Sequence, residues 1–191
     1  MLTIAITAAG SGIGQPVIDS VRDSTLQARL VGLEASPWGR GAYECDSAYL
    51  FPLASDPTYK ERMMELCERV GIDVLISGSD PELIPIAEMA SDLAARGTAA
   101  IVGSPASIRL CRDKLALSQH MIERGIPFVR TWSLEEARSQ AADLPYPLIV
   151  KERSGSGSVG AQVLSGPQDW ERVHCAGAWI AQPYLLSASW Y

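Results

Sequence analysis

The segment that decides the fold of the C-terminal half runs from residue 147 to residue 163 and has the sequence PLIVKERSGSGSVGAQV. An apolar run ends at Lys151, just before a loop in which glycine and serine alternate. An apolar, β-prone run follows the loop. This pattern predicts a strand, a flexible loop and a second strand. Glycines let consecutive N–H groups approach and converge on anionic oxygens. The segment therefore predicts a cover for a polyphosphate, and the alternative is a glycine-rich hairpin with an exposed lysine.

The order of lysine and glycine distinguishes this loop from a P-loop. In a P-loop the lysine follows the glycines and opens a helix. Here Lys151 precedes the glycines, and the residues that follow alternate like a strand.

Two further segments bear on the function. Residues 111–118, CRDKLALS, open a helix that we expect to end near Gly125, and residues 178–185, AWIAQPYL, form a short strand downstream of the loop. Together with the glycine-rich segment, they resemble the ATP-grasp superfamily, specifically the branch similar to the large subunit of carbamoyl-phosphate synthase. In that family an aspartate-lysine helix start, a second lysine, a glycine-rich loop and a hinge strand enclose ATP.

The resemblance implies a set of nucleotide-binding residues. Lys114 matches the first basic residue, which reaches the phosphates, and Lys151 matches the second. The loop that closes over the β- and γ-phosphates matches Gly155, Ser156, Gly157, Ser158 and Gly160. Each lysine has a simpler alternative as an ordinary solvated side chain.

The resemblance also places an adenine-binding hinge at residues 182–185. Gln182 lies where the family often has a glutamate that faces the adenine amino group. Pro183 removes one backbone donor. Carbonyls, or the N–H of Tyr184 or Leu185, are therefore expected to contact the adenine edge. The alternative for Gln182 is a strand residue that faces water.

Strands and helices alternate along the first half of the chain. We predict strands at residues 2–7, 29–33, 47–51, 73–77 and 99–102, and helices at residues 15–23, 57–71 and 81–96. Alternation at this spacing predicts an α/β fold with a parallel sheet and right-handed crossovers. The resemblance identifies residues 1–110 as a Rossmann-like pre-ATP-grasp domain.

A boundary is expected near residues 104–112. Beyond it, strands are predicted at residues 128–131, 148–151, 161–164 and 179–182. They predict a small α+β unit over residues 111–191, which the resemblance identifies as the ATP-grasp lid subdomain.

Composition limits the classes of partner. The chain has 191 residues, 47% of them hydrophobic, and a formal net charge of −6. It can bury a sizeable core, but it lacks the basic surplus that nonspecific binding to nucleic acid or an anionic membrane requires. Its four cysteines are widely spaced, which favours reduced thiols and a cytoplasmic protein. No signal peptide or membrane span is predicted.

The first strand and its turn raise a rival function. The turn TAAGSGIG, residues 7–14, resembles the nucleotide turn of short-chain dehydrogenases, and Glu34 ends the second strand as a ribose-binding acid would. Gln15 stands where the last glycine of the dinucleotide fingerprint belongs, and the catalytic tyrosine and lysine of that family are absent. A packing role for the glycines, or contacts with a small ligand, are the alternatives to an NAD(P) site.

Two other loops carry polar side chains near predicted strand ends. Asp80 follows a buried strand, where open α/β sheets place ligands, but Asp80 or Ser79 could instead cap the next helix. Arg40 could meet an anionic substrate or remain solvated.

The resemblance implies ATP-dependent ligation, in which a carboxylate attacks the γ-phosphate and an amine captures the acyl phosphate. Such chemistry needs positioning, positive charge and Mg²⁺. We expect the metal ligands outside this chain, because the family carries them in a further lobe beyond the hinge strand. The expected partners are ATP and a small carboxylate, and homo-oligomer formation is left open. We expect the chain alone to be inactive, and a non-catalytic nucleotide-binding module is a further alternative.

Overall fold

A computed structural model describes all residues except Ser156, Ser158 and 186–191. The chain divides into two compact units, Met1–Ile108 and Arg109–Tyr191. Helix α5 (Pro105–Arg112) contains this boundary. Among the described residues, none of the helices combines the length and the apolar character needed to cross a bilayer.

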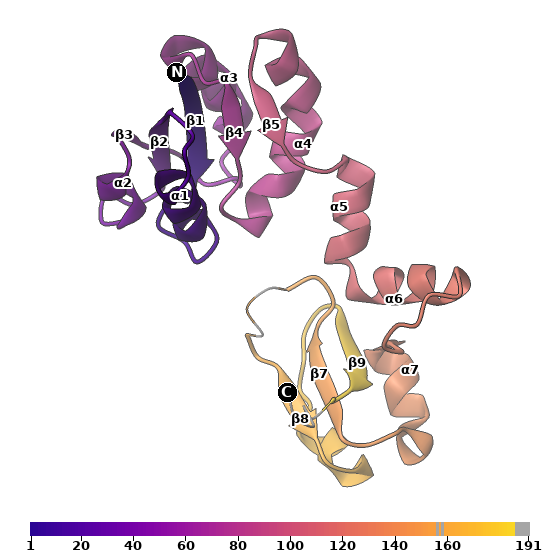
Figure 1. Cartoon of the computed structure of the whole chain (residues 1–191). Coiled ribbons are helices and arrows are strands. Elements are labelled where there is room, and N and C mark those ends of the chain that lie inside the picture. The colour runs from indigo at the N-terminus through magenta and orange to yellow at the C-terminus, as the bar shows by residue number, and fades with distance from the viewer. Residues whose placement is uncertain (156, 158, 186–191) are drawn as a thin grey trace. The chain divides into compact units, whose positions relative to one another are not determined.

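The first unit is a parallel five-stranded sheet with helices on both faces (Figure 1), and the predicted α/β class is confirmed. The sheet has the order β3-β2-β1-β4-β5, and each neighbouring pair is parallel. The strands are β1 (Leu2–Thr7), β2 (Ala28–Glu34), β3 (Ser47–Leu50), β4 (Val74–Ile76) and β5 (Ala99–Ile101). The helices are α1 (Gly14–Asp23), α2 (Gly41–Glu44), α3 (Tyr59–Val70) and α4 (Asp80–Ala95).

Alternating side chains of β1 and β2 separate the core into two layers. Ala5 and Val31 belong to the cluster that contains Met63 of α3 and Ile86 of α4. Residues of the opposite parity, Ile4, Ile6 and Leu30, pack with Ile18 of α1. Burial on both faces explains why these strands are nearly continuous apolar runs.

The second unit contains an antiparallel four-stranded sheet in the order β6-β9-β7-β8. Its strands are β6 (Trp132–Ser133), β7 (Leu148–Glu152), β8 (Gln162–Leu164) and β9 (Trp179–Pro183). Its helical segments are α6 (Lys114–Glu123), α7 (Leu134–Ser139) and the 3-10 turns η1 (Ala141–Asp143) and η2 (Pro167–Arg172). One face of the sheet packs on a core that includes Trp132, Leu148, Val150, Trp170 and Ala181.

The strand predicted at residues 128–131 is wrong, because strand β6 begins only at Trp132. Just before β6, side chains provide hydrogen bonds to the backbone. The Val129 carbonyl accepts one from the Ser118 hydroxyl at 2.8 Å and one from the Thr131 hydroxyl at 3.3 Å. A carbonyl used in this way does not need a neighbouring strand.

The close approach of two loops at the end of β1 gives a test of this fold. A Cβ at Gly78 would lie 2.1 Å from the Thr7 carbonyl oxygen, whereas a Cβ at Gly12 would have no atom within 4 Å. We expect Gly78→Ala to lower the free energy of unfolding by about 1–3 kcal/mol, as overpacking does. Urea denaturation measures the change. Gly12→Ala is the control and should stay within about 0.5 kcal/mol of the parent; equal values for both variants would contradict the described contact.

Candidate functional site

The start of helix α6 is fixed to the end of strand β7 by one carboxylate, that of Asp113. Its Oδ1 accepts the N–H groups of Leu115 at 3.2 Å and Ala116 at 3.0 Å, so Asp113 is the N-cap of α6. The same carboxylate forms a bidentate pair with Arg153, with Nε–Oδ1 at 2.7 Å and Nη2–Oδ2 at 2.6 Å. Hydrogen bonds from Arg153 lower the pKa of Asp113. The pair therefore positions the first turn of α6 beside the loop that follows β7.

Lys114, the first residue of α6, places its ammonium group on the backbone of that loop. Its Nζ donates to the carbonyls of Gly155 at 2.7 Å, Glu152 at 3.2 Å and Arg153 at 3.4 Å. The Lys114 N–H also donates to the Arg153 carbonyl, at 3.1 Å. The charge of Lys114 is thus held at the start of the glycine-rich segment by main-chain atoms.

Lys151 brings a second positive charge to the same region. Partial burial lowers its pKa, and repulsion by the Lys114 charge lowers it further. Among the residues that the structure describes, neither lysine forms an ion pair with an acidic side chain. The chain contains three lysines, and two of them lie near the start of the glycine-rich segment, the third being Lys60. Two neighbouring cations without an acidic partner form a site that favours an anion.

The sheet face that carries Lys151 is partly exposed on β7 and β8. Ile149 and Lys151 lie on the opposite face of β7 from the buried Leu148 and Val150, because side chains alternate along a strand. Gln182 is paired with Ile149 across the ladder and therefore shares its face. Val163 of β8 lies on the same face and is 50% exposed. On this face Ile149 therefore neighbours both Lys151 and Gln182, and Val163 lies beyond it on β8.

Gln182 does not face water, which was one of its two interpretations. It is buried, and its Nε2 donates to the Thr131 hydroxyl at 2.8 Å. This bond fixes the orientation of the amide within the sheet face.

The predicted hinge donors differ in availability. The Tyr184 N–H donates to the Pro147 carbonyl at 2.8 Å and so continues the pairing of β9 with β7. That donor is not free for a ligand. Leu185, whose side chain is 76% exposed, follows the end of the strand. Its N–H and the neighbouring carbonyls remain the candidates for contact with an adenine edge.

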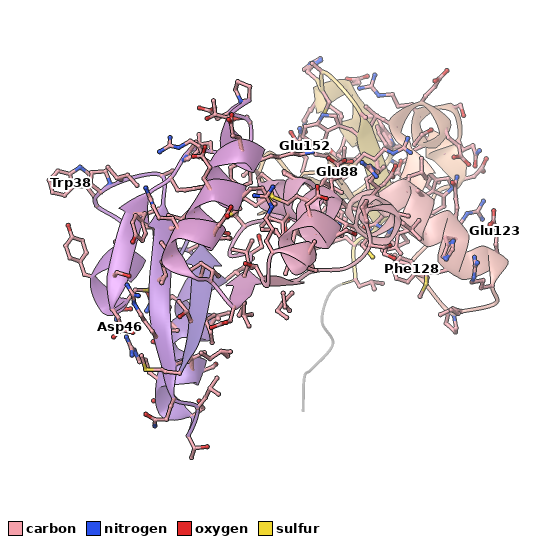
Figure 2. All side chains as sticks on the ribbon, turned by 90° about the horizontal axis from the view of Figure 1, so that it is seen from above. Trp38, Asp46, Glu88, Glu123, Phe128 and Glu152 are labelled. Carbon is pink, nitrogen blue, oxygen red and sulfur yellow. The ribbon has the colours of Figure 1, made fainter. Side chains whose placement is uncertain are left out.

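The glycine-rich loop is described only in part, because Ser156 and Ser158 lie outside the described residues. Gly157 and Gly160 have φ angles of 68° and 70°, in the region that favours glycine. A Cβ at Gly155 would lie 2.8 Å from the Cβ of Glu152, the residue labelled in Figure 2. The backbone here approaches its neighbour more closely than a residue with a side chain allows.

The glycine turn of the first unit is closed by its own contacts. The Gly10 N–H donates to Oε1 of Glu34. Ser11 Oγ accepts the N–H groups of Ile13 at 3.2 Å and Gly14 at 2.9 Å. A dinucleotide pyrophosphate needs free N–H groups at such a turn, and here a carboxylate occupies one and a hydroxyl two others. These contacts argue against the NAD(P) alternative.

Two other predictions about loops need correction or restriction. Neither Ser79 nor Asp80 caps α4 through its side chain; the Ser79 hydroxyl instead donates to Oε2 of Glu82 at 2.6 Å. Arg40 is paired with Glu44 at 2.6 Å, which neutralises the charge that an anionic substrate would need. Within the described part of the chain, no group of three or more His, Cys, Asp or Glu side chains is arranged to hold a metal ion.

Sequence reasoning did not assign roles to Asp113 and Arg153. A signal for Asp113 was present, because aspartate directly before a helical segment is a preferred N-cap. Nothing local signals its second role, since Arg153 lies 40 residues away and meets it only through the fold.

Comparison with known proteins supports the fold. Residues 4–101 match the protein family described as PylC-like, N-terminal domain. No curated protein matches the chain. Among solved structures, the chain resembles N5-carboxyaminoimidazole synthetase from Staphylococcus aureus complexed with ADP, with a TM-score of 0.70 and 20% identity over 96% of this chain and 48% of that one.

Two further structures show the same likeness. The biotin carboxylase domain of 2-oxoglutarate carboxylase from Hydrogenobacter thermophilus, in complex with MgADP, gives a TM-score of 0.68 and 22% identity, covering 97% of this chain and 45% of that one. L-amino acid ligase from Bacillus licheniformis gives a TM-score of 0.69 and 14% identity, and the match covers 97% of this chain and 44% of that one. The chain thus has the fold of the N-terminal part of ATP-grasp proteins and spans less than half the length of these three.

The two roles of Asp113 can be separated by substitution. Asparagine keeps an acceptor for the cap but removes the charge, whereas alanine removes both. We expect Asp113→Asn to lower the free energy of unfolding by about 0.2–1 kcal/mol, the range for a partly exposed ion pair. Asp113→Ala should cost about 0.5–2 kcal/mol more, through the lost cap. Chemical denaturation at pH 7 measures both.

The pH dependence of this difference follows from the lowered pKa of Asp113. The native carboxyl has a pKa below its unfolded value, so the stabilisation is complete above the unfolded pKa and is lost as the pH falls through the native one. The difference in free energy of unfolding between the parent and Asp113→Asn should therefore disappear at acid pH. Asp143→Asn in η1 serves as the control; a gap that persists at acid pH, or that the control reproduces, would count against the ion pair.

Proposed function

The chain belongs to the PylC-like N-terminal domain family, and from this premise we propose that it is the nucleotide-binding portion of an ATP-grasp carboxylate–amine ligase. The proposed reaction passes through an acyl phosphate, as in enzymes similar to carbamoyl-phosphate synthase. The carboxylate and the amine are both small molecules. Turnover is proposed for the whole protein, since the chain spans less than half of the structures compared above.

The observation that carries the proposal is that Lys114 and Lys151 both lie at the start of the glycine-rich segment. The pKa of Lys151 is lowered by burial and by Lys114, so holding both ammonium groups charged has a free-energy cost in the folded chain. An anion between them would relieve that cost. A triphosphate supplies several negative oxygens at one place, and each charge-assisted hydrogen bond to it is stronger than a neutral one.

The exposed part of this sheet face, on β7 and β8, favours a nucleotide over inorganic phosphate. Ile149 and Val163 offer an accessible apolar surface next to Lys151, of the kind on which a flat heteroaromatic ring can lie. Gln182, oriented by Thr131, and the backbone of Leu185 lie toward the other end of β9 from the partner of Lys151. Base and phosphates would then occupy opposite ends of one surface.

The residues present fit ATP through their cations and this surface. When bound with Mg²⁺, ATP supplies the phosphoryl group that activates the carboxylate. The part of this chain is to hold negative charge. Lys151 would do so with an ammonium group that has no ion-pair partner among the described residues, and Lys114 once its carbonyl partners are exchanged for phosphate oxygens. Arg153 acts indirectly, because its guanidinium is committed to Asp113.

Substitution of each lysine tests the proposal with binding and stability as separate measurements. We expect Lys151→Met to weaken ATP binding by about tenfold or more, equivalent to about 1.4 kcal/mol, without lowering Tm. The stability follows from the sign of the shift: the native pKa lies below the unfolded one, so the charged form is disfavoured by folding and its removal relieves that cost. Calorimetric titration and thermal unfolding provide the two values.

Lys114→Met should weaken ATP binding and also lower Tm, because three carbonyls lose their donor. Lys60→Met, on α3 of the first unit, is the matched control and should leave ATP binding unchanged. The proposal fails if Lys151→Met binds ATP as tightly as the parent, or if NAD(H) binds more tightly than ATP.

A further inference from the structure

A cavity lies wholly within the first unit, at the carboxyl ends of its parallel strands. Its volume is about 470 Å³, within the range of small-molecule sites. Leu33 at the end of β2 and Phe51, Pro52 and Leu53 after β3 give it apolar walls. None of the residues assigned above to ATP binding lines it. Open α/β sheets bind ligands at this edge.

One wall of this cavity is a buried carboxylate, Glu82, which is 8% exposed. Its Oε2 accepts the hydroxyls of Thr7 and Ser79, each at 2.6 Å, and its Oε1 accepts the Tyr59 hydroxyl at 2.9 Å. Burial, and then the charge of Glu82, raise the pKa of Tyr59, so the phenol stays a neutral donor. All three contacts come from uncharged groups.

The charge of Glu82 therefore has hydrogen bonds but no counter-ion. Among the described residues, no ion pair involves Glu82 and no lysine, arginine or histidine lines the cavity. Buried charges in proteins are ordinarily paired, because hydroxyl donors replace hydration only in part. A cation in the cavity would complete the pairing.

A second carboxylate, Glu34, lines the same cavity. Its Oε1 accepts the Gly10 N–H, which holds the side chain at the end of β2. Two carboxylates and no basic residue disfavour an anionic ligand. The apolar walls disfavour a bare divalent metal ion, which prefers six or more oxygen ligands.

We propose that this cavity binds a primary ammonium group carried on a small aliphatic body, with Glu82 and Glu34 as its anionic contacts and the residues 51–53 as its apolar contacts. The site is independent of the nucleotide: it would exist whether or not ATP binds the second unit. If this cavity does not bind an ammonium group, the proposal for Lys114 and Lys151 still stands. If the lysines do not bind ATP, the proposal for this cavity still stands.

Three probes of matched shape test the charge selectivity: n-pentylamine, 1-pentanol and pentanoate. NMR titration of the whole chain should show n-pentylamine binding tighter than 1-pentanol, with pentanoate weakest. The backbone amides of Gly10 and Gly78 are the reporters, because Gly10 donates to Glu34 and Gly78 donates at 3.1 Å to the Thr7 hydroxyl that contacts Glu82.

Substitution tests the contacts. Glu82→Gln should weaken n-pentylamine binding by about tenfold or more, as loss of a charge-assisted contact does. Glu34→Gln, at a less buried position, should weaken it as well, and it carries the test if Glu82→Gln does not fold. Glu65→Gln, on the exposed side of α3, is the control and should bind like the parent. ATP affinity, measured in parallel, should not change in any of these variants.

The proposal is overturned if pentanoate binds as well as n-pentylamine, or if Mg²⁺ alone shifts the same amides. It is also overturned if n-pentylamine binding survives both Glu34→Gln and a folded Glu82→Gln.

Discussion

The second unit depends on the carboxylate of Asp113, which caps one element and binds another. Through its cap it fixes where α6 begins, and through Arg153 it fixes α6 to the end of β7. Because Lys114 is the next residue, its direction is set by the same carboxylate. The contact between Lys114 and the loop carbonyls is thus a consequence of helix capping. The ion pair of Asp113 with Arg153 therefore helps to position Lys114.

Glycine-rich turns illustrate how similar local sequences acquire different chemistry. The turn after β1 has glycines at the right places for a nucleotide, but the carboxylate of Glu34 and the hydroxyl of Ser11 take up the donors. In the loop after β7, the carbonyls of Arg153 and Gly155 instead accept hydrogen bonds from Lys114. Whether a turn attracts phosphate depends on which groups of the main chain the surrounding structure has already used.

The fold was largely predictable because it depends on patterns that lie within short segments. Continuous apolar runs separated by amphipathic helices predicted the parallel sheet, and the alternation around Lys151 predicted the β7 and β8 pair. The strand at residues 128–131 was wrong because side-chain contacts to the Val129 carbonyl, made across the fold, replace a ladder there. Lys114 and Lys151 were identified through family resemblance. The structure places both at the start of the glycine-rich segment, and their role remains a prediction. The pairing of Asp113 with Arg153 and the hydroxyls around Glu82 were not predictable, since their partners are distant in the chain.

Ser79 and Glu82 have the spacing of a capping box, yet the tertiary contact of Glu82 with Thr7 and Tyr59 prevails over that local arrangement.

The ammonium group of Lys114 is already coordinated by peptide oxygens before any ligand arrives. A monovalent anion that displaced these carbonyls would replace three hydrogen bonds of Lys114 by one ionic contact, so the net gain in binding free energy would be small. A ligand with densely grouped negative oxygens would gain from Lys114 and Lys151 at once. If the proposed site binds phosphate, competition from these carbonyls would favour ligands of high charge density over chloride and simple carboxylates.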